Sequence, residues 1–174
     1  IRDREKTFAP RRIALLVGID DYRDAALGDL RYAAKDAADL ERVLTEAGDF
    51  DTVERLSGTV TALQFWERFR ALSATLSRDD TFLVFIAAHG TVSFDARGTR
   101  LHVLATDSQL DRASSTGINV ALLEAAMGRL PARRRVLALD TCHSGDGRSA
   151  LSEETADEVT RFRGPIPPPE AVNI

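Results

Sequence analysis

Cysteine is nearly absent from this chain of 174 residues, which contains only Cys142. A single cysteine excludes a disulfide within the chain, so a reducing compartment, and hence a cytoplasmic location, is predicted. Long apolar runs are lacking too: the longest, residues 82–88, is far too short to cross a bilayer. The charged N-terminal residues have no apolar region behind them, which is not typical of a signal peptide.

A basic excess is also missing, since the formal net charge is −4. Surfaces that bind nucleic acid normally carry such an excess, so nucleic acid is not predicted as a partner. A membrane is not predicted either, because the apolar runs are too short. Lysine is scarce beside arginine, which indicates a GC-rich and bacterial genome. The chain does have 44% hydrophobic and 29% charged residues of mixed sign, enough for one folded domain with a sizeable core.

Apolar stretches alternate with segments of helical periodicity. Strands are predicted at residues 13–19, 52–56, 81–88 and 136–139, the last also buried, with a hairpin around Gly98. Helices are predicted at residues 30–47, 61–76 and 120–130, the last two begun by the N-caps Thr61 and Asn119. The buried face of the second helix is predicted to contain Leu63, Trp66, Phe69, Leu72 and Leu76.

Fully apolar strands are typical of a sheet covered on both faces. The alternation therefore predicts an α/β fold with a mostly parallel sheet and helices on both sides. In such sheets the chemistry lies at the carboxyl ends of the strands. His89 follows one apolar strand and Cys142 follows another, so His89 can take the thiol proton and make Cys142 a nucleophile. The amides of Gly90 and Cys142 are candidates for an oxyanion hole.

Each of these residues also has a simpler interpretation. A free cysteine is most often a small buried hydrophobic residue, but its place at a strand end near a glycine favours a catalytic role. His143 follows Cys142 directly and is expected to point away from it, and His102 lies in the hairpin and is expected to be a structural or a surface residue. No spacing typical of metal ligands is present, so no metal is predicted.

At this point the sequence resembles the caspase and metacaspase clan of cysteine peptidases. His89-Gly90 lies 53 positions before Cys142, within the sequence Asp-Thr-Cys-His-Ser-Gly, and caspases place the two catalytic residues about 50 apart. The opening strand, with Leu16-Val-Gly-Ile-Asp20, Tyr22 and Lys35-Asp-Ala37, is similar to the start of metacaspases and bacterial orthocaspases. The resemblance covers residues 12–145 and implies a caspase-like fold and a cysteine endopeptidase.

The resemblance also implies a substrate preference. Animal caspases carry Gln-Ala before the nucleophile and accept aspartate, whereas Asp140 stands here two residues before Cys142. In metacaspase-like enzymes an acid at this position, together with one matching Asp36, forms a pocket for Arg or Lys. A pair of carboxylates attracts a guanidinium or ammonium group and repels an aspartate. Without this resemblance, Asp36 is interpreted equally well as a solvated helix residue and Asp140 as a strand-end cap.

Caspase-like domains carry two further strands in a small subunit, which residues 151–174 cannot supply. The resemblance thus implies a large-subunit part at residues 12–150, an extension at 1–11 and a flexible linker at 151–174, with the small subunit packed beside the fourth strand. The linker contains Arg161 and Arg163, where an enzyme that cuts after arginine could process its own zymogen, or where another protease could cleave it. The chemistry requires no cofactor. Some metacaspases need calcium, and the acidic pairs Asp20-Asp21 and Glu153-Glu154 are too generic to assign a site.

Three alternatives remain open. The chain could be an inactive caspase-like scaffold, although the intact His–Cys pair argues against this. It could be a peptidase of the separase or CHAT type, although the Cys-His-Ser-Gly sequence fits metacaspases better. It could also be a redox-sensing domain that uses Cys142 as a thiol of low pKa.

Overall fold

The computed structural model of the chain describes residues 9–95 and 98–143, and within these the side chains of Asp95, Cys142 and His143 are not described. The described residues form a six-stranded sheet with the order β2-β1-β3-β4-β5, and β6 also pairs with β3. The long strands are β1 (Arg12–Ile19), β2 (Thr52–Gly58), β3 (Thr81–Asp95) and β6 (Arg134–His143). These four strands are parallel to one another, as predicted.

Strand β3 is longer than predicted because it takes part in two kinds of pairing. Its first half lies between β1 and β6, with Ala87 as the last residue opposite β1. From Gly90 onward it forms an antiparallel hairpin with β4 (Gly98–Val103), which in turn pairs with the short β5 (Ile118–Asn119). Gly98 closes the hairpin with a φ of 108°, a conformation that glycine adopts without strain.

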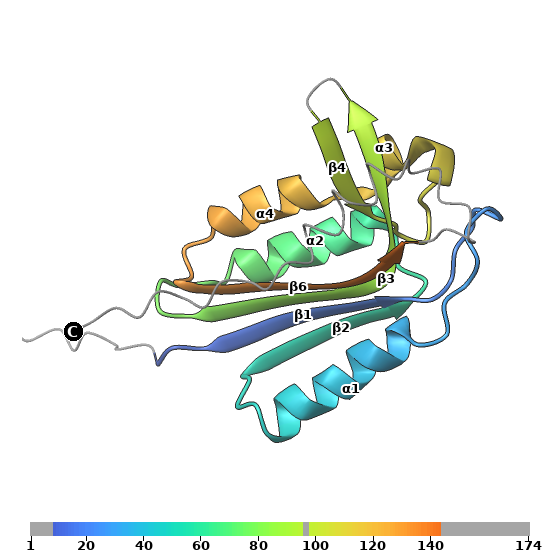
Figure 1. The fold of residues 1–174 in the computed structure, drawn as a ribbon. Helices are drawn as coiled ribbons and strands as arrows, with labels where there is room; N and C mark the ends of the chain where they lie inside the picture. Colours follow the sequence, from blue (N-terminus) through green and yellow to red (C-terminus); the bar gives the residue numbers. More distant parts are fainter. Residues whose placement is uncertain (1–8, 96–97, 144–174) are drawn as a thin grey trace, which may run out of the picture. The chain divides into compact units, whose positions relative to one another are not determined.

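Helices cover both faces of the sheet (Figure 1). On one face, α1 (Ala33–Glu46) packs against Ala14 and Leu16 of β1. On the other, α2 (Ala62–Ser73) and α4 (Val120–Gly128) pack against the alternate strand residues, among them Leu15 and Val84. Both sets are buried, which explains why β1 is apolar throughout.

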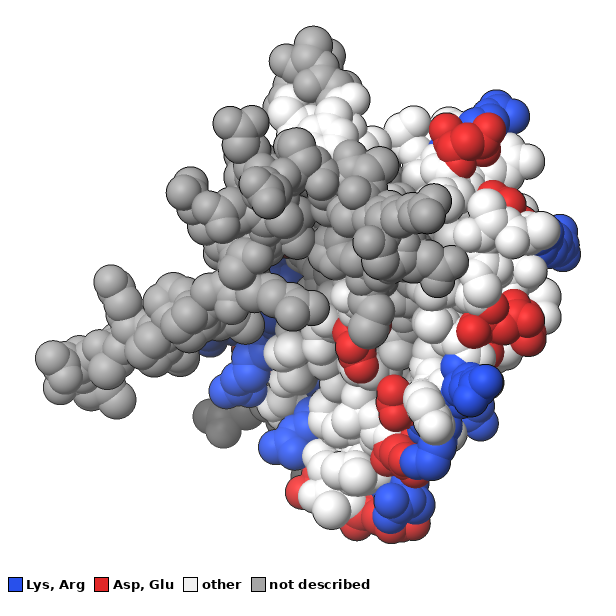
Figure 2. Space-filling view, turned by 45° about the vertical axis from the view of Figure 1, so that its right-hand side comes forward, with Lys and Arg blue, Asp and Glu red and all other residues white. Residues whose placement is uncertain are grey.

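Helix α1 begins three residues later than predicted. Tyr32 occupies the N-cap position of α1, but its side chain forms no capping hydrogen bond. Instead, the carboxylate of Asp20 accepts the backbone N–H of Ala34 at 3.2 Å. A carboxylate at a helix N-terminus also interacts favourably with the helix dipole. Around α1, Figure 2 shows acidic and basic side chains interspersed, and several are paired, including Lys35 with Asp39.

Helix α2 begins at the predicted N-cap, since Thr61 and Gln64 form a complete capping box. The prediction for its buried face was wrong at Leu63, which is 65% exposed, whereas Phe65 is fully buried. The sequence offered two overlapping stripes of apolar residues. Packing on the sheet selected the one with i, i+4, i+7 spacing: Phe65, Phe69 and Leu72.

The last helix also has its predicted cap, because the Asn119 side chain accepts the N–H of Leu122 at 3.1 Å. The C-terminal end of α4 is capped by a residue of the sheet, because the guanidinium group of Arg135 on β6 donates to the carbonyl of Gly128 at 2.8 Å. Two short helical segments before it were not predicted: η1 (Leu110–Arg112) and α3 (Ala113–Thr116). At three and four residues they carry too little periodicity to be recognised.

Strand β6 is less buried than predicted. Val136 is 48% exposed and Leu137 and Leu139 are half-buried, so within the described part of the chain β6 is an edge strand. The family resemblance implies a small subunit packed beside this strand, and that expectation stays a prediction.

Candidate active site

The two predicted catalytic residues occupy neighbouring positions in the sheet. In the parallel register of β3 and β6, His89 lies directly opposite Cys142. Neighbouring strands are about 4.8 Å apart, and residues side by side in a parallel pair project from the same face. The fold therefore brings together the backbones of two residues that are 53 positions apart. Cys142 lies near the carboxyl end of β6, as the sequence predicted, whereas His89 lies inside β3, just past the segment that pairs with β1, because β3 continues to Asp95.

The imidazole of His89 is held in one orientation. The side chain is buried, and Nε2 lies 2.6 Å from the carbonyl oxygen of Gly28. A carbonyl can only accept, so Nε2 carries the proton and Nδ1 has a free lone pair in the neutral ring. Nδ1 is buried without a hydrogen-bond partner among the residues that the structure describes. It is therefore the nitrogen available to take a proton.

The loop between β1 and α1 supplies the groups that hold His89. Tyr22 accepts the backbone N–H of His89 through its hydroxyl group at 2.8 Å, and its ring lies 4.8 Å from the imidazole between centroids. Gly28 belongs to the same loop. Sequence reasoning missed both contacts: Gly28 contributes only a backbone carbonyl, which leaves no signal in a sequence, and Tyr22 was noted only as part of the family resemblance.

Gly90 follows His89 at the point where β4 and β6 both flank β3. A Cβ atom at this position would lie 3.0 Å from the Cβ of Thr141 on β6, so only glycine fits without a shift. Close packing against Thr141 therefore explains why position 90 is a glycine, independently of the predicted role of its amide. The oxyanion hole formed by Gly90 and Cys142 stays a prediction.

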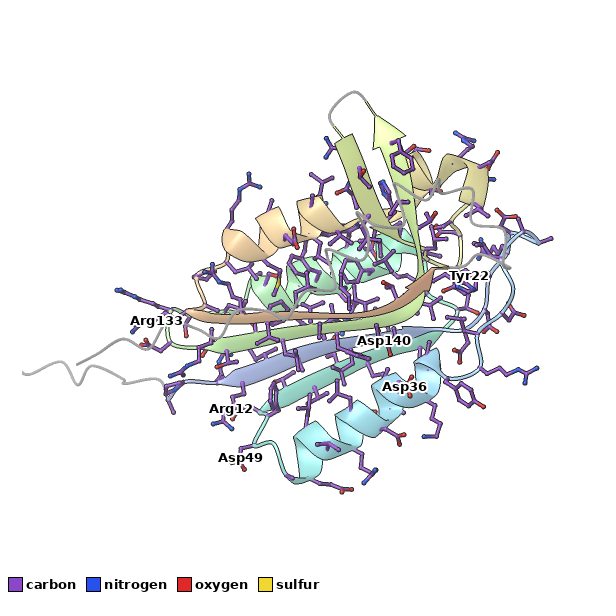
Figure 3. All side chains as sticks on the ribbon, viewed as in Figure 1. Arg12, Tyr22, Asp36, Asp49, Arg133 and Asp140 are labelled. Atoms are coloured by element: carbon purple, nitrogen blue, oxygen red, sulfur yellow. The ribbon has the colours of Figure 1, made fainter. Side chains whose placement is uncertain are left out.

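The two predicted specificity residues lie on the same side of the sheet. Asp140 of β6 is opposite Ala87 of β3, which is opposite Gly18 of β1. Helix α1 crosses Gly18 closely, and Asp36 is in its first turn; Figure 3 labels both acids on the α1 side of the sheet. Asp140 is exposed and Asp36 half-buried, and neither has an ion-pair partner among the described residues.

Other candidates are placed away from this arrangement or outside the described residues. His102 is buried on β4, where Nε2 lies 2.8 Å from the hydroxyl of Ser93, in agreement with a structural role. Burial, with the nearby charge of Arg100, lowers the pKa of this histidine. Arg161, Arg163 and the pair at 153–154 lie outside the residues that the structure describes.

Neither a metal cluster nor a membrane-crossing helix occurs in the part of the chain that the structure describes. Within residues 9–95 and 98–143 there is no group of three or more His, Cys, Asp or Glu side chains placed to hold a metal ion. Over the same residues, no helix is long and apolar enough to cross a membrane.

Comparison with known proteins gives the family. The chain is similar to a crystal structure of a protein from Geobacter sulfurreducens, with a TM-score of 0.63 and 20% identity over 88% of this chain and 55% of that one. It is also similar to the Drosophila initiator caspase Dronc, with a TM-score of 0.56 and 18% identity over 77% of this chain and 50% of that one. These likenesses confirm the caspase-like fold.

The chain spans about half the length of both structures that it matches. No curated protein matches it. A family model described as the caspase domain matches residues 11–170, which is most of the chain. The chain therefore belongs to the caspase domain family, a family of cysteine peptidases.

Proposed function

We propose that this chain is the catalytic large-subunit part of a cysteine endopeptidase that cleaves proteins after arginine or lysine. The observation that carries the proposal is the register of β3 and β6, which sets His89 beside Cys142. The bond from Nε2 to Gly28 leaves Nδ1 as the proton acceptor. A histidine that faces a thiol through its free nitrogen converts the thiol to a thiolate near neutral pH.

The reaction follows from these groups. The Cys142 thiolate attacks the carbonyl carbon of the peptide bond, and backbone amides such as that of Gly90 stabilise the oxyanion that forms. When the C–N bond breaks, the imidazolium of His89 gives its proton to the leaving amine, and a thioester remains on Cys142. Water then attacks the thioester with His89 as the base, releasing the acid and restoring the thiol. No step requires a metal or a cofactor; a stimulating role of calcium is left to experiment.

The preference for basic residues is supported by charge. Asp36 and Asp140 lie on the same side of the sheet, and among the described residues neither forms an ion pair. Carboxylates also outnumber basic side chains in the segments around the carboxyl ends of β1 and β4, with Asp20, Asp21, Asp24, Asp29, Asp36, Asp107 and Asp111 against Arg23, Arg31, Lys35 and Arg112. Such a surface attracts a guanidinium or ammonium group and repels aspartate.

A partner segment completes this proposal. Among the described residues β6 is an edge strand, with Val136 exposed and Leu137 and Leu139 half-buried, so a small subunit that adds strands beside it would bury this apolar surface. Cleavage of the linker after Arg161 or Arg163 would be the activating step. Mass spectrometry of the activated protein checks it, and the absence of new termini in the linker would count against it.

The test uses the complete protein on fluorogenic peptides that end in Arg, Lys, Asp or Ala, with and without calcium. Cleavage after Arg or Lys is expected, with a loss of at least about 10³-fold in kcat/KM for Cys142→Ala and about 10²-fold or more for His89→Ala. Asp36→Asn and Asp140→Asn should each lower kcat/KM for Arg peptides by about tenfold or more. Asp39→Asn is the matched control, since Asp39 is on the same helix but paired with Lys35.

Other outcomes point to other functions. Cleavage only after Asp would keep the peptidase and reject the roles of Asp36 and Asp140. Absence of cleavage in the processed protein, with folding unimpaired, would favour an inactive scaffold. Reversible oxidation of Cys142 without cleavage would favour the redox sensor.

A further inference from the structure

His89 lies at a seam in the sheet. Up to Ala87, β3 is flanked by β1, and from Gly90 it is flanked by β4. At the seam, the carbonyl of His89 accepts the N–H of Leu104 at 2.8 Å. Its own N–H is taken up by a side chain, the hydroxyl group of Tyr22, at 2.8 Å. Tyr22 thus replaces a strand at the one position of β3 that carries the predicted base.

Tyr22 contacts the imidazole as well as the backbone. The two rings lie 4.8 Å apart between centroids, tilted by 45°. Since His89 is 8% exposed, the tyrosine ring is one of the walls that limit rotation of the imidazole. Three contacts therefore hold His89: the Tyr22 hydroxyl group binds its main chain, the Tyr22 ring packs against its imidazole, and the carbonyl of Gly28 binds Nε2.

The tyrosine is itself fixed. Its hydroxyl group donates to the carbonyl of Ile19 at 3.2 Å, and its backbone N–H donates to Asp29 at 3.1 Å. Burial raises the pKa of the Tyr22 phenol well above its ordinary value, and the hydrogen bond from His89 offsets this only in part. Because the ordinary pKa of a tyrosine phenol is already about 10, the hydroxyl group is protonated near neutral pH, and it can accept from His89 while donating to Ile19.

The loop that carries Tyr22 is anchored on the far side of the seam. Leu27 is 4% exposed and packs in a small apolar cluster with Leu104 and Ala113, to which Tyr22 also contributes. The backbone N–H of Arg23 donates to the carbonyl of Thr106 at 3.0 Å. Tyr22 and Gly28 are therefore parts of one docked loop, and the position of the imidazole depends on that loop.

From this geometry we propose that Tyr22 is a positioning residue, which holds His89 so that Nδ1 faces Cys142. The proposal rests on the proposed function for its catalytic consequence. Among the described residues, the Tyr22 hydroxyl group bonds only to main-chain groups, those of His89 and Ile19, so its effect on the reaction would pass through His89. Small displacements of a catalytic group cost large factors in rate, on the order of 10²-fold for about 1 Å. Loss of the hydroxyl group should therefore act on the chemical step and leave substrate binding nearly intact.

The test is Tyr22→Phe in the complete protein, with Tyr32→Phe as the matched control. Tyr32 is the only other tyrosine of the chain, is 66% exposed and has no hydrogen bond from its hydroxyl group to a described residue. Tyr22→Phe should lower kcat by about tenfold or more with KM within about twofold, the pattern of a lost transition-state interaction. Tyr32→Phe should leave both unchanged. A Tyr22→Phe enzyme with the kcat of the wild type would overturn the proposal.

A second readout does not depend on cleavage. The rate at which iodoacetamide alkylates Cys142 is measured against pH, with the modified peptide followed by mass spectrometry. In the wild type the midpoint should lie below the ordinary thiol pKa of about 8.5, and in Tyr22→Phe it should move back toward that value. A shifted midpoint in a protein that cleaves no peptide would keep the positioning role and reject the peptidase. An unshifted midpoint would reject the positioning role even if cleavage after arginine is observed.

A third variant covers the case in which Tyr22→Phe does not fold. Incorporation of 3-fluorotyrosine at position 22 keeps the ring and the hydroxyl group but weakens the hydroxyl oxygen as an acceptor. It should lower kcat by about twofold to fivefold, with the same alkylation shift in smaller measure. Unchanged kcat and alkylation in this variant would contradict the proposal.

Discussion

Asp80 shows how much one side chain can organise. It is fully buried just before β3, and its carboxylate accepts the backbone N–H groups of Arg11 and Ser77, both at 2.8 Å, and the Arg11 guanidinium at 2.7 Å. Burial alone would raise the pKa of this carboxyl, but the hydrogen bonds from Arg11 and Ser77 outweigh it and hold the pKa well below its usual range. The ionised form therefore ties the N-terminal end of β1 to that of β3.

Asp80→Asn is expected to lower the free energy of unfolding by about 2–3 kcal/mol, because the amide cannot accept all of these bonds. Since the folded pKa is depressed, the contribution of Asp80 is complete above its ordinary pKa of about 3.9 and is lost as the pH falls below it. Urea denaturation at pH 7 and pH 3 checks both parts.

The exposed neighbour Asp79 is the control, and Asp79→Asn should change the stability by less than about 0.5 kcal/mol. If both variants were equally stable at pH 7, the buried network would not have the role assigned to Asp80.

Among the elements, α1 is the one whose position matters most for the site, because its first turn carries Asp36. It approaches β1 at Gly18, where a Cβ atom would lie 2.2 Å from the carbonyl oxygen of Ala33. The obstruction is backbone, so a side-chain rotation cannot relieve it. Gly18→Ala should destabilise the protein by about 2–4 kcal/mol and displace α1.

Calorimetry of Gly18→Ala, compared with Gly128→Ala, measures this effect. Gly128 ends α4, and a Cβ atom added there would meet nothing within 4 Å, so alanine should be neutral or stabilising by less than about 1 kcal/mol. A Gly18→Ala protein with the melting temperature of the wild type would mean that α1 can move away from β1 without loss.

Helix α2 depends on its first turn in a different way. Thr61 and Gln64 satisfy each other's backbone N–H groups at 3.2 Å and 2.9 Å. Thr61→Ala should cost about 1 kcal/mol of stability, and Thr61→Ser, which keeps the hydroxyl group, should cost a few tenths at most. Chemical denaturation of the two variants separates the two effects; equal losses would indicate that the methyl group, not the capping bond, is responsible.

At the scale of the whole molecule, the free edge of the sheet at β6 affects stability, and the carboxylates around the carboxyl ends of β1 and β4 affect substrate binding. Val136 on β6 and Val43 on α1 are exposed to nearly the same extent, 48% and 49%. If a small subunit packs beside β6 in the complete protein, Val136→Lys should cost about 2 kcal/mol or more there, whereas Val43→Lys should cost less than about 0.5 kcal/mol. Thermal unfolding of both variants tests this, and equal small effects would contradict the partner at β6.

The excess of carboxylates around the carboxyl ends of β1 and β4 should make the association with basic substrates depend on salt concentration. For peptides that end in arginine, kcat/KM should fall several-fold between about 50 mM and 500 mM NaCl, and more steeply when further lysines are added to the peptide. Alkylation of Cys142 by the neutral reagent iodoacetamide is the control and should change little. A kcat/KM independent of salt would show that the carboxylates around the site do not attract the substrate.

The sequence alone was enough to predict the order and type of the long elements, the caps Thr61 and Asn119, and the placement of His89 and Cys142 on neighbouring parallel strands. These features follow from the local periodicity of apolar residues, which the sequence contains, and from the general rule that the carboxyl ends of parallel strands meet at one edge of the sheet. The register that sets His89 opposite Cys142 agrees with that expectation.

Tertiary structure alone decided the rest. Which stripe of α2 is buried, and that β6 is an edge strand among the described residues, follow from packing between distant segments, which periodicity does not encode. The carbonyl of Gly28 and the hydroxyl of Tyr22 reach His89 across 61 and 67 positions of sequence. A backbone carbonyl is common to every residue, so only the folded loop reveals which one orients the imidazole.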